Sequence, residues 1–178
     1  MPQTHPPIFP PSLLSPAIHS ATPPGYSVRP LQRDDFSRGY FDCLATLTWI
    51  GEPTQQDFEK QYDWMVAKGE GWFYNVVIDF EGRIVGTGVV IVERKFIHNF
   101  GTIGHIEDIS IAKAHQGKGL GKLLINALDS VAQNIGCYKA ILDCSPENEG
   151  FYRKCQYEKC GTEMSHYFEP YRSDYERG

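Results

Sequence analysis

The segment from Lys113 to Lys122 has the composition of an anion-binding loop. It contains three lysines, one histidine, three glycines and no acidic residue, in a chain whose formal net charge is −5. Glycines at 117, 119 and 121 allow backbone N–H groups to point into one concavity, and a helix that begins here adds its positive N-terminal end. We therefore predict that this segment binds the pyrophosphate of an anionic cofactor.

Three interpretations compete for this loop. A dinucleotide-binding fingerprint has the spacing GxGxxG, whereas these glycines are spaced GxGxG. A P-loop requires GxxxxGK followed by Ser or Thr, but position 116 is glutamine and Leu123 follows Lys122. Both nucleotide-binding interpretations are therefore excluded. The third interpretation is that the segment is only a glycine-rich turn before an ordinary helix and binds no ligand.

Two acidic residues, Glu107 and Asp108, are adjacent in an otherwise apolar stretch. Burying a charge is costly unless the charge is paired or used, so a functional role is favoured over a surface role. Consecutive strand residues face opposite sides of a sheet, so the two carboxylates line one wall only if a β-bulge turns the chain.

A second basic cluster, formed by Arg94, Lys95 and His98, surrounds Phe96 and Ile97. Its cations can hold the phosphate of a substrate, although a solvated hairpin end has the same composition. The cluster argues against a cationic acceptor, which would favour an acidic groove.

The elements that position these residues are predicted from hydrophobic periodicity and turn signals. Strands are expected at 26–31, 72–80, 83–93, 103–111, 138–144 and 157–168. Helices are expected at 34–47, 54–69, 120–135 and 145–155, the second opened by a capping box of Thr54 and Asp57. The strand at 138–144 is nearly apolar throughout, as expected for one buried on both faces. The fold class is therefore α+β, with a mixed sheet whose two middle strands flank the glycine-rich loop and helix.

The chain is predicted to form one folded domain, residues 25–168, between two tails. Residues 1–28 hold eight of the twelve prolines and no Lys or Arg, so we expect residues 1–24 to form a flexible tail without a signal peptide. Residues 169–178 are expected to form a C-terminal tail.

Charge, cysteine spacing and hydropathy exclude several classes of protein. The acidic balance argues against a nucleic-acid partner, and no run of about 20 apolar residues suggests a membrane span. Five cysteines without CxxC spacing suggest neither a disulfide framework nor a structural metal, so we expect no metal and a cytoplasmic location.

The loop and its flanks resemble a known family. Gln116-x-x-Gly119-x-Gly121, after a strand and before an amphipathic helix, is similar to the Q/R-x-x-G-x-G/A signature of the GNAT superfamily of N-acyltransferases. Three flanking segments, 104–109, 136–144 and 148–155, resemble the eukaryotic glucosamine-6-phosphate N-acetyltransferase family within it, and the resemblance covers about residues 26–166.

The resemblance implies a GNAT fold with splayed middle strands, acetyl-CoA as the acyl donor and D-glucosamine 6-phosphate as the acceptor. By motif, the residues implied along acetyl-CoA are Ile109, Ser110, Ile111, Gln116, Gly117, Lys118, Gly119, Leu120, Gly121, Lys122, Asp143, Asn148 and Tyr152. Those implied along the amino sugar are Thr48, Lys95, Phe96, Ile97, His98, Glu107, Asp108, Ile109, Tyr138 and Lys139.

The implied chemistry is direct attack of a neutral amine on the thioester, for which Tyr152, Asp143 and Glu107 are the candidate catalytic residues. Tyr152 would protonate the departing thiolate. The alternative is that Phe151 and Tyr152 only pack a short helix. Cys144 is expected to be a buried strand cysteine rather than a nucleophile, because no histidine adjoins it.

The resemblance also implies a homodimer and a place in UDP-N-acetylglucosamine synthesis. Relatives tend to carry a basic residue after the Glu-Met of the last strand, but Ser165 follows Met164 here, and Arg172 or Arg177 would have to replace it. Two other functions remain open: acetylation of a different amine, and non-catalytic binding of acyl-CoA.

Overall fold

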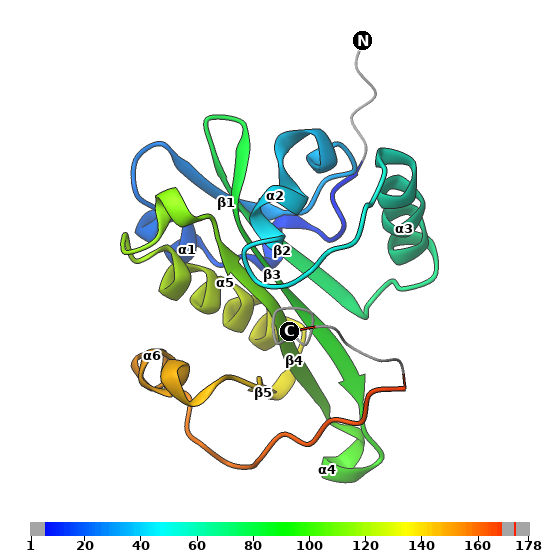
Figure 1. The fold of residues 1–178 in the computed structure, drawn as a ribbon. Coiled ribbons are helices and arrows are strands. Elements are labelled where there is room, and N and C mark those ends of the chain that lie inside the picture. The colour runs from blue at the N-terminus through cyan, green and yellow to red at the C-terminus, as the bar shows by residue number, and fades with distance from the viewer. Residues whose placement is uncertain (1–5, 169–172, 174–178) are drawn as a thin grey trace.

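A five-stranded sheet forms the centre of the molecule (Figure 1). The computed structural model describes residues 6–168 and residue 173. The strands are β1 (Tyr26–Pro30), β2 (Phe73–Phe80), β3 (Arg83–Arg94), β4 (Thr102–Ile111) and β5 (Cys137–Ile141), in that spatial order. Neighbours are antiparallel from β1 to β4, and β4 is parallel to β5. The predicted mixed α+β sheet is thus confirmed.

Helices cover both faces of the sheet. Successive residues of a strand point to opposite faces, so each face carries its own cluster of buried apolar side chains. Val76 and Ile78 of β2 belong to the cluster packed on α5 (Leu120–Asn134). Val77, between them, belongs to the cluster with α2 (Tyr40–Leu44) and α3 (Gln55–Ala67). The period of two along a strand explains this alternation.

The shorter helices lie before, between and after the strands. They are α1 (Pro16–Ala21), α4 (Ile97–Phe100), α6 (Glu149–Lys154) and the 3₁₀ turns η1 (Pro11–Leu13), η2 (Asp35–Arg38), η3 (Lys113–His115) and η4 (Pro146–Asn148). No helix in the described part of the chain is both long and apolar enough to cross a membrane.

Local signals for turns and caps are confirmed. Thr54 Oγ1 accepts from the Asp57 amide at 3.2 Å, and Asp57 accepts from the Thr54 amide at 3.1 Å, which is the predicted capping box. Glu81 and Gly82 have φ of 51° and 81°, as the type I′ turn of a β2–β3 hairpin requires. The predicted helix at 34–47 is instead two pieces, η2 and α2, because Gly39 between them has φ 88°.

The N-terminal segment contradicts the expectation of a flexible tail over residues 6–24. Phe9, Leu14 and Ile18 are buried in the core on α5. The Ser15 amide donates to Ser130 Oγ at 3.1 Å, which fixes the start of α1 on α5. The prediction of a flexible tail was wrong because it relied on proline content alone. Pro11 and Pro16 are the first residues of η1 and α1, a position where proline is favoured.

The C-terminal part also differs from the prediction. Residues 157–168 are described, but they form no strand. β5 ends at Ile141 and its residues are half-buried or exposed, because no described strand pairs with its outer edge. The predicted tail at 169–178, with Arg172 and Arg177, lies outside the described residues apart from residue 173.

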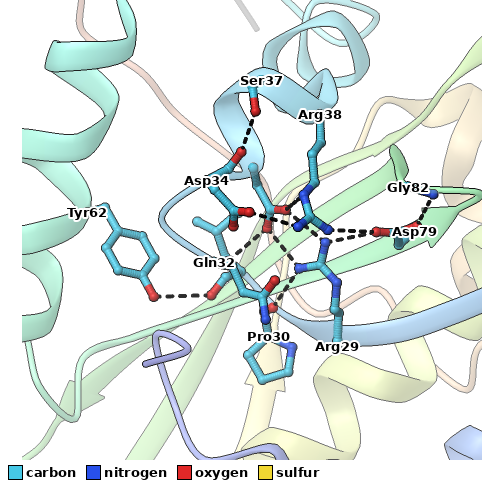
Figure 2. Close-up of polar contacts among 11 residues, drawn as sticks. Arg29, Pro30, Gln32, Asp34, Ser37, Arg38, Tyr62, Asp79 and Gly82 are labelled. Atoms are coloured by element: carbon cyan, nitrogen blue, oxygen red, sulfur yellow. Dashed lines mark hydrogen bonds and ion pairs between the residues drawn. The ribbon is translucent and has the colours of Figure 1, made fainter. Parts of the chain in front are cut away.

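A network of ion pairs ties β1, β2 and η2 together, and Figure 2 shows Arg29, Arg38 and Asp79 within it. Asp35 is 0% exposed and accepts two hydrogen bonds of 2.8 Å from the Arg29 guanidinium and one of 2.8 Å from the Gln32 amide. Arg29 also donates to Asp79 of β2 at 3.0 Å. This network fixes the edge of the sheet opposite β5.

We expect Asp35→Ala to lower the free energy of unfolding by about 3 kcal/mol, because it leaves a partly buried guanidinium without its main partner. Asp34→Ala is the matched control, since the Asp34 side chain is 56% exposed and pairs with Arg38 only at the surface. Its cost should stay below about 1 kcal/mol. Urea unfolding of both variants measures the difference, and equal costs would contradict the assignment of Asp35 as the central group.

Candidate functional site

The glycine-rich loop leaves the end of β4 and becomes the first turn of α5. Gln116 Nε2 donates to the carbonyl of Ile111 at 2.9 Å, which folds the loop back onto the strand. Gly117 and Gly119 have φ of 74° and 79°, a region that favours glycine, and Gly119 is the N-cap of α5. A Cβ at either position would meet nothing within 4 Å, so the loop backbone is open to a ligand.

Two of the residues implied along the cofactor are turned inward. Leu120 is 1% exposed and belongs to the α5 core. Ser110 is 4% exposed and its hydroxyl donates to the Cys43 carbonyl at 2.7 Å. The side chains of these two residues are therefore not available to a ligand.

A β-bulge interrupts β4 at the adjacent carboxylates. Thr87 of β3 pairs with Ser110, and Val89 pairs with Glu107, so two β4 residues, Asp108 and Ile109, lie opposite the single residue Gly88. Asp108 has φ 57°, and its carbonyl accepts from Thr87 Oγ1 at 3.2 Å. A β-bulge, which is the condition for both carboxylates to line one wall, is therefore present at these residues.

The bulge changes which residues face α5. Ile106 and Ile109 both pack with the α5 cluster although they are three residues apart, which regular alternation does not allow. Glu107 between them lies on the opposite face, in a cavity with Ile91 and Glu93 of β3. The bulge thus separates a carboxylate that faces the cavity from apolar residues that hold the strand on α5.

Burial raises the pKa of Glu107, and the nearby carboxylates of Asp108 and Asp143 raise it further. Burial also raises the pKa of Asp108, and this residue contributes to a raised pKa of Tyr40, whose main cause is burial. A carboxylate with a raised pKa is a better proton acceptor, so Glu107 suits the role of a base.

The middle strands separate beside this bulge. β4 and β5 pair from Thr102 and Cys137 to His105 and Ile141, where β5 ends. β4 continues to Ile111, and no described strand pairs with that edge. The edge therefore presents free backbone groups to a ligand that extends along the strand.

A cavity of about 490 Å³ lies between the end of β5, α6 and the segment after α6. Asp143, Tyr152 and Glu163 contribute to its lining. The carboxylate of Glu107 contributes to a raised pKa of Tyr152, and Asp143 does the same for Glu107, so the three candidate catalytic residues lie within electrostatic reach of one another.

Tyr152 is half-buried on α6. Its ring packs against Phe151, with ring centroids 5.0 Å apart. Tyr152 therefore has a packing role in this short helix, and this role does not exclude a catalytic one. Burial is the main cause of a raised pKa of the phenol, which therefore keeps its proton at neutral pH. A protonated phenol at the wall of this cavity can also donate a proton.

Cys144 does not lie in a buried strand as predicted. It lies beyond the end of β5 and is exposed, because β5 is shorter than the sequence suggested. Partial desolvation of the sulfur and the neighbouring carboxylates of Glu149 and Asp143 raise the pKa of the thiol. These surroundings favour the thiol over the nucleophilic thiolate.

The second basic cluster lies at the tip of the β3–β4 connection. Lys95 Nζ forms an ion pair with Glu93, whose other oxygen lies 2.8 Å from His105 Nε2. His98 stacks on Tyr138 with ring centroids 4.5 Å apart, so two separate segments implied for the sugar come together. Phe96 and Ile97 have apolar side chains that are 92% and 63% exposed, so only their backbone N–H groups suit a phosphate.

Three further residues belong to this region but were missed in the sequence. Glu93, His105 and Trp72 line a cavity of about 600 Å³ together with Glu107. His105 precedes Glu107 by two positions, so strand alternation could have placed it on the same face. Thr48, by contrast, is half-buried in the turn after α2, and Asn148 is exposed and donates to Ser145 Oγ at 3.1 Å.

Comparison with known families decides the affiliation. The model of the acetyltransferase (GNAT) family matches residues 27–157. The chain belongs to this family. Acetyltransferases of this fold use acetyl-CoA, and no group of three or more His, Cys, Asp or Glu among residues 6–168 and 173 is arranged to hold a metal ion.

Similar proteins within the GNAT family share a name. A glucosamine 6-phosphate N-acetyltransferase of Candida albicans is 46% identical over 142 residues, which is 80% of this chain and 95% of the relative. One from Dictyostelium discoideum is 41% identical over 80% of this chain and 91% of the relative. The crystal structure of the Arabidopsis thaliana enzyme of that name is 37% identical, with a TM-score of 0.78, and covers 81% of this chain and 99% of that one.

We expect Gly119→Ala to weaken binding of acetyl-CoA about tenfold. A left-handed conformation costs an L-residue about 1–2 kcal/mol. Alanine at this position would therefore favour other loop conformations, and a cost of about 1.4 kcal/mol corresponds to a tenfold loss of affinity. Gly82→Ala is the matched control, since Gly82 also has φ 81° and open space but lies in the β2–β3 hairpin. Calorimetric titration with acetyl-CoA measures both variants, and unchanged binding by Gly119→Ala would exclude the loop as the binding site.

Proposed function

We propose that the protein transfers the acetyl group of acetyl-CoA to the amine of D-glucosamine 6-phosphate, giving N-acetyl-D-glucosamine 6-phosphate and CoA. The observation that carries the proposal is the 46% identity to a relative of that name over 95% of the relative's length. The glycine-rich loop and the carboxylates at the bulge support it independently, since the two features supply a donor site and an acceptor site on one strand.

The residues present fit acetyl-CoA. The open backbone of Gly117 and Gly119, with exposed Lys118 and Lys122 beside it, suits a pyrophosphate at the start of α5. The unpaired edge of β4 at 109–111 suits the amide groups of the pantetheine arm. Asp143 and Asn148, exposed beyond β5, would lie along the same ligand.

The acceptor would lie on the other side of the bulge. Glu107 and Asp108 can accept hydrogen bonds from the ammonium and hydroxyl groups of the sugar. Lys95, His98 and Lys139 would attract its phosphate, while Tyr138, Thr48 and the backbone at 96–97 complete the proposed wall. Lys95 would exchange its partner Glu93 for the phosphate on binding.

The proposed reaction is direct transfer in a ternary complex. Glu107 takes a proton from the bound ammonium, so the neutral amine can attack the thioester carbonyl. A C–N bond forms, the C–S bond breaks, and Tyr152 donates its proton to the departing sulfur. The phenolate left on Tyr152 takes the second proton from the attacking nitrogen, so the products are a neutral amide and CoA thiol. Asp143 would orient the reactants between Glu107 and Tyr152, and no acyl-enzyme is required.

The wider setting is proposed from the resemblance. It comprises a homodimer, a cytoplasmic location and supply of N-acetylglucosamine 6-phosphate for UDP-N-acetylglucosamine synthesis. Exposed Phe96, Phe100 and Met164, which are 73–93% exposed, support an interface between copies. The competing functions are acetylation of another amine and binding of acyl-CoA without transfer.

Release of free CoA thiol from acetyl-CoA across a panel of amines tests the proposed function. We expect release with glucosamine 6-phosphate and at least tenfold slower release with glucosamine, polyamines and amino acids. Faster release with another amine would replace the acceptor, and no release with any amine would favour the binding function.

We expect Tyr152→Phe to lower kcat by about 10² to 10⁴, because an oriented general acid contributes about that much. Affinity for acetyl-CoA should change less than twofold, since the phenyl ring still packs on Phe151. Steady-state kinetics with a separate binding titration check this pair of results. An unchanged kcat would remove Tyr152 from the mechanism.

Lys95→Met should raise KM for glucosamine 6-phosphate about tenfold and leave KM for unphosphorylated glucosamine unchanged, because it removes a cation but keeps the aliphatic stem. Lys60→Met on exposed α3 is the control and should alter neither constant. An equal rise with both sugars would argue against a phosphate contact at Lys95.

A further inference from the structure

A short hydrogen bond connects α5 to the segment after α6. Tyr157 donates from its hydroxyl to Asp129 Oδ1 at 2.5 Å. Asp129 lies in the third turn of α5, and both residues are half-buried. A half-buried carboxylate is costly in a core, and a bond to an ionised acceptor is stronger than one between neutral groups, so this contact holds Tyr157 firmly.

Tyr157 in turn contacts Tyr152. The two ring centroids are 6.2 Å apart at an interplanar angle of 72°, an edge-to-face arrangement. The Tyr157 amide also donates to the Tyr152 carbonyl at 3.0 Å. Both rings line the cavity of about 490 Å³. The position of Tyr157 therefore restricts the plane of the Tyr152 ring from one side.

Phe151 contacts the Tyr152 ring as well, and its own ring is fixed by the start of α5. A Cβ added at Gly121 would lie 3.3 Å from Phe151 Cζ, so the two helices approach closely there. The Phe151 ring meets Tyr152 at 73°. Tyr152 thus contacts two rings, and both are anchored to α5, one at Gly121 and the other at Asp129.

We propose that Asp129 and Tyr157 are a positioning pair that aims the Tyr152 hydroxyl at the sulfur of the bound thioester. This inference rests on the proposed role of Tyr152 as proton donor. Because α5 begins at the glycine-rich loop, the pair fixes the direction of the donor relative to the helix that would hold the pyrophosphate. Neither residue touches a reacting atom.

The test is a double-mutant cycle between Tyr157→Phe and Tyr152→Phe. Tyr157→Phe keeps the ring but removes the bond to Asp129. We expect it to lower kcat about tenfold while KM for acetyl-CoA changes less than twofold, since only the transfer step needs the aimed phenol. In the Tyr152→Phe background the same change should lower kcat by less than twofold.

Two further variants separate positioning from stability. Asp129→Asn keeps an oxygen that can accept from Tyr157 and should retain more activity than Asp129→Ala. Tyr62→Phe is the control for loss of a buried hydroxyl bond, because Tyr62 donates to the Pro6 carbonyl at 2.6 Å away from the cavity. It should lower thermal stability without changing kcat.

The outcomes of the cycle are distinguishable. If Tyr152→Phe lowers kcat but Tyr157→Phe does not, or does so equally in both backgrounds, the positioning pair is wrong and the role of Tyr152 stands. If Tyr152→Phe leaves kcat unchanged, the role of Tyr152 fails and the positioning pair fails with it.

Discussion

One extra residue in β4 is the constraint on which the site depends. Asp108 and Ile109 share a single partner position, Gly88, and this mismatch forces Asp108 to φ 57°. A larger residue at Gly88 would displace the ends of two packed side chains, because a Cβ there would lie 2.6 Å from Ile109 Cδ1 and 2.9 Å from Leu128 Cδ1. The bulge lets Ile106 and Ile109 hold the strand on α5 while Glu107 faces the opposite cavity.

The unpaired edge of β4 leaves backbone groups beside the bulge available to a ligand. β5 stops pairing with β4 at His105, two residues before Glu107, so the bulged half of β4 has no paired strand on that side among the described residues. α5 starts at the loop that follows β4 and packs on one face of the sheet. Its residues Gly121 and Asp129 lie against Phe151 and Tyr157, the two neighbours of the Tyr152 ring. One strand and one helix thus bring together the proposed donor site, the acceptor site and the proton donor.

Local sequence signals predicted much of this arrangement. The start of α5 at the glycine-rich loop, the Thr54 capping box and the Glu81-Gly82 turn depend on neighbouring residues only, and the structure confirms them. The β-bulge at Glu107 and Asp108 could not be predicted outright, because the pairing register of β4 depends on its partner strand β3. The sequence showed only that both carboxylates need a bulge to line one wall. The contacts of Glu93 with His105 and of Asp129 with Tyr157 join distant segments and have no local signature.

The failed predictions have a common physical cause, which is tertiary contact. The proline-rich composition of residues 6–24 says nothing of the α5 surface that buries Phe9, Leu14 and Ile18. Residues 157–168 have strand-like composition, but a strand needs a paired neighbour, and no described residue supplies one. The length of β5, and with it the exposure of Cys144, follows from the same missing partner.

The central claim is that the bulged strand holds thioester and amine together, so that the acetyl group moves directly between them. Initial velocities measured while the concentrations of acetyl-CoA and glucosamine 6-phosphate are both varied test this most directly. Direct transfer predicts double-reciprocal lines that intersect, because both substrates must be bound before CoA leaves. Parallel lines, with CoA released before the sugar binds, would require an acyl-enzyme and would contradict the account.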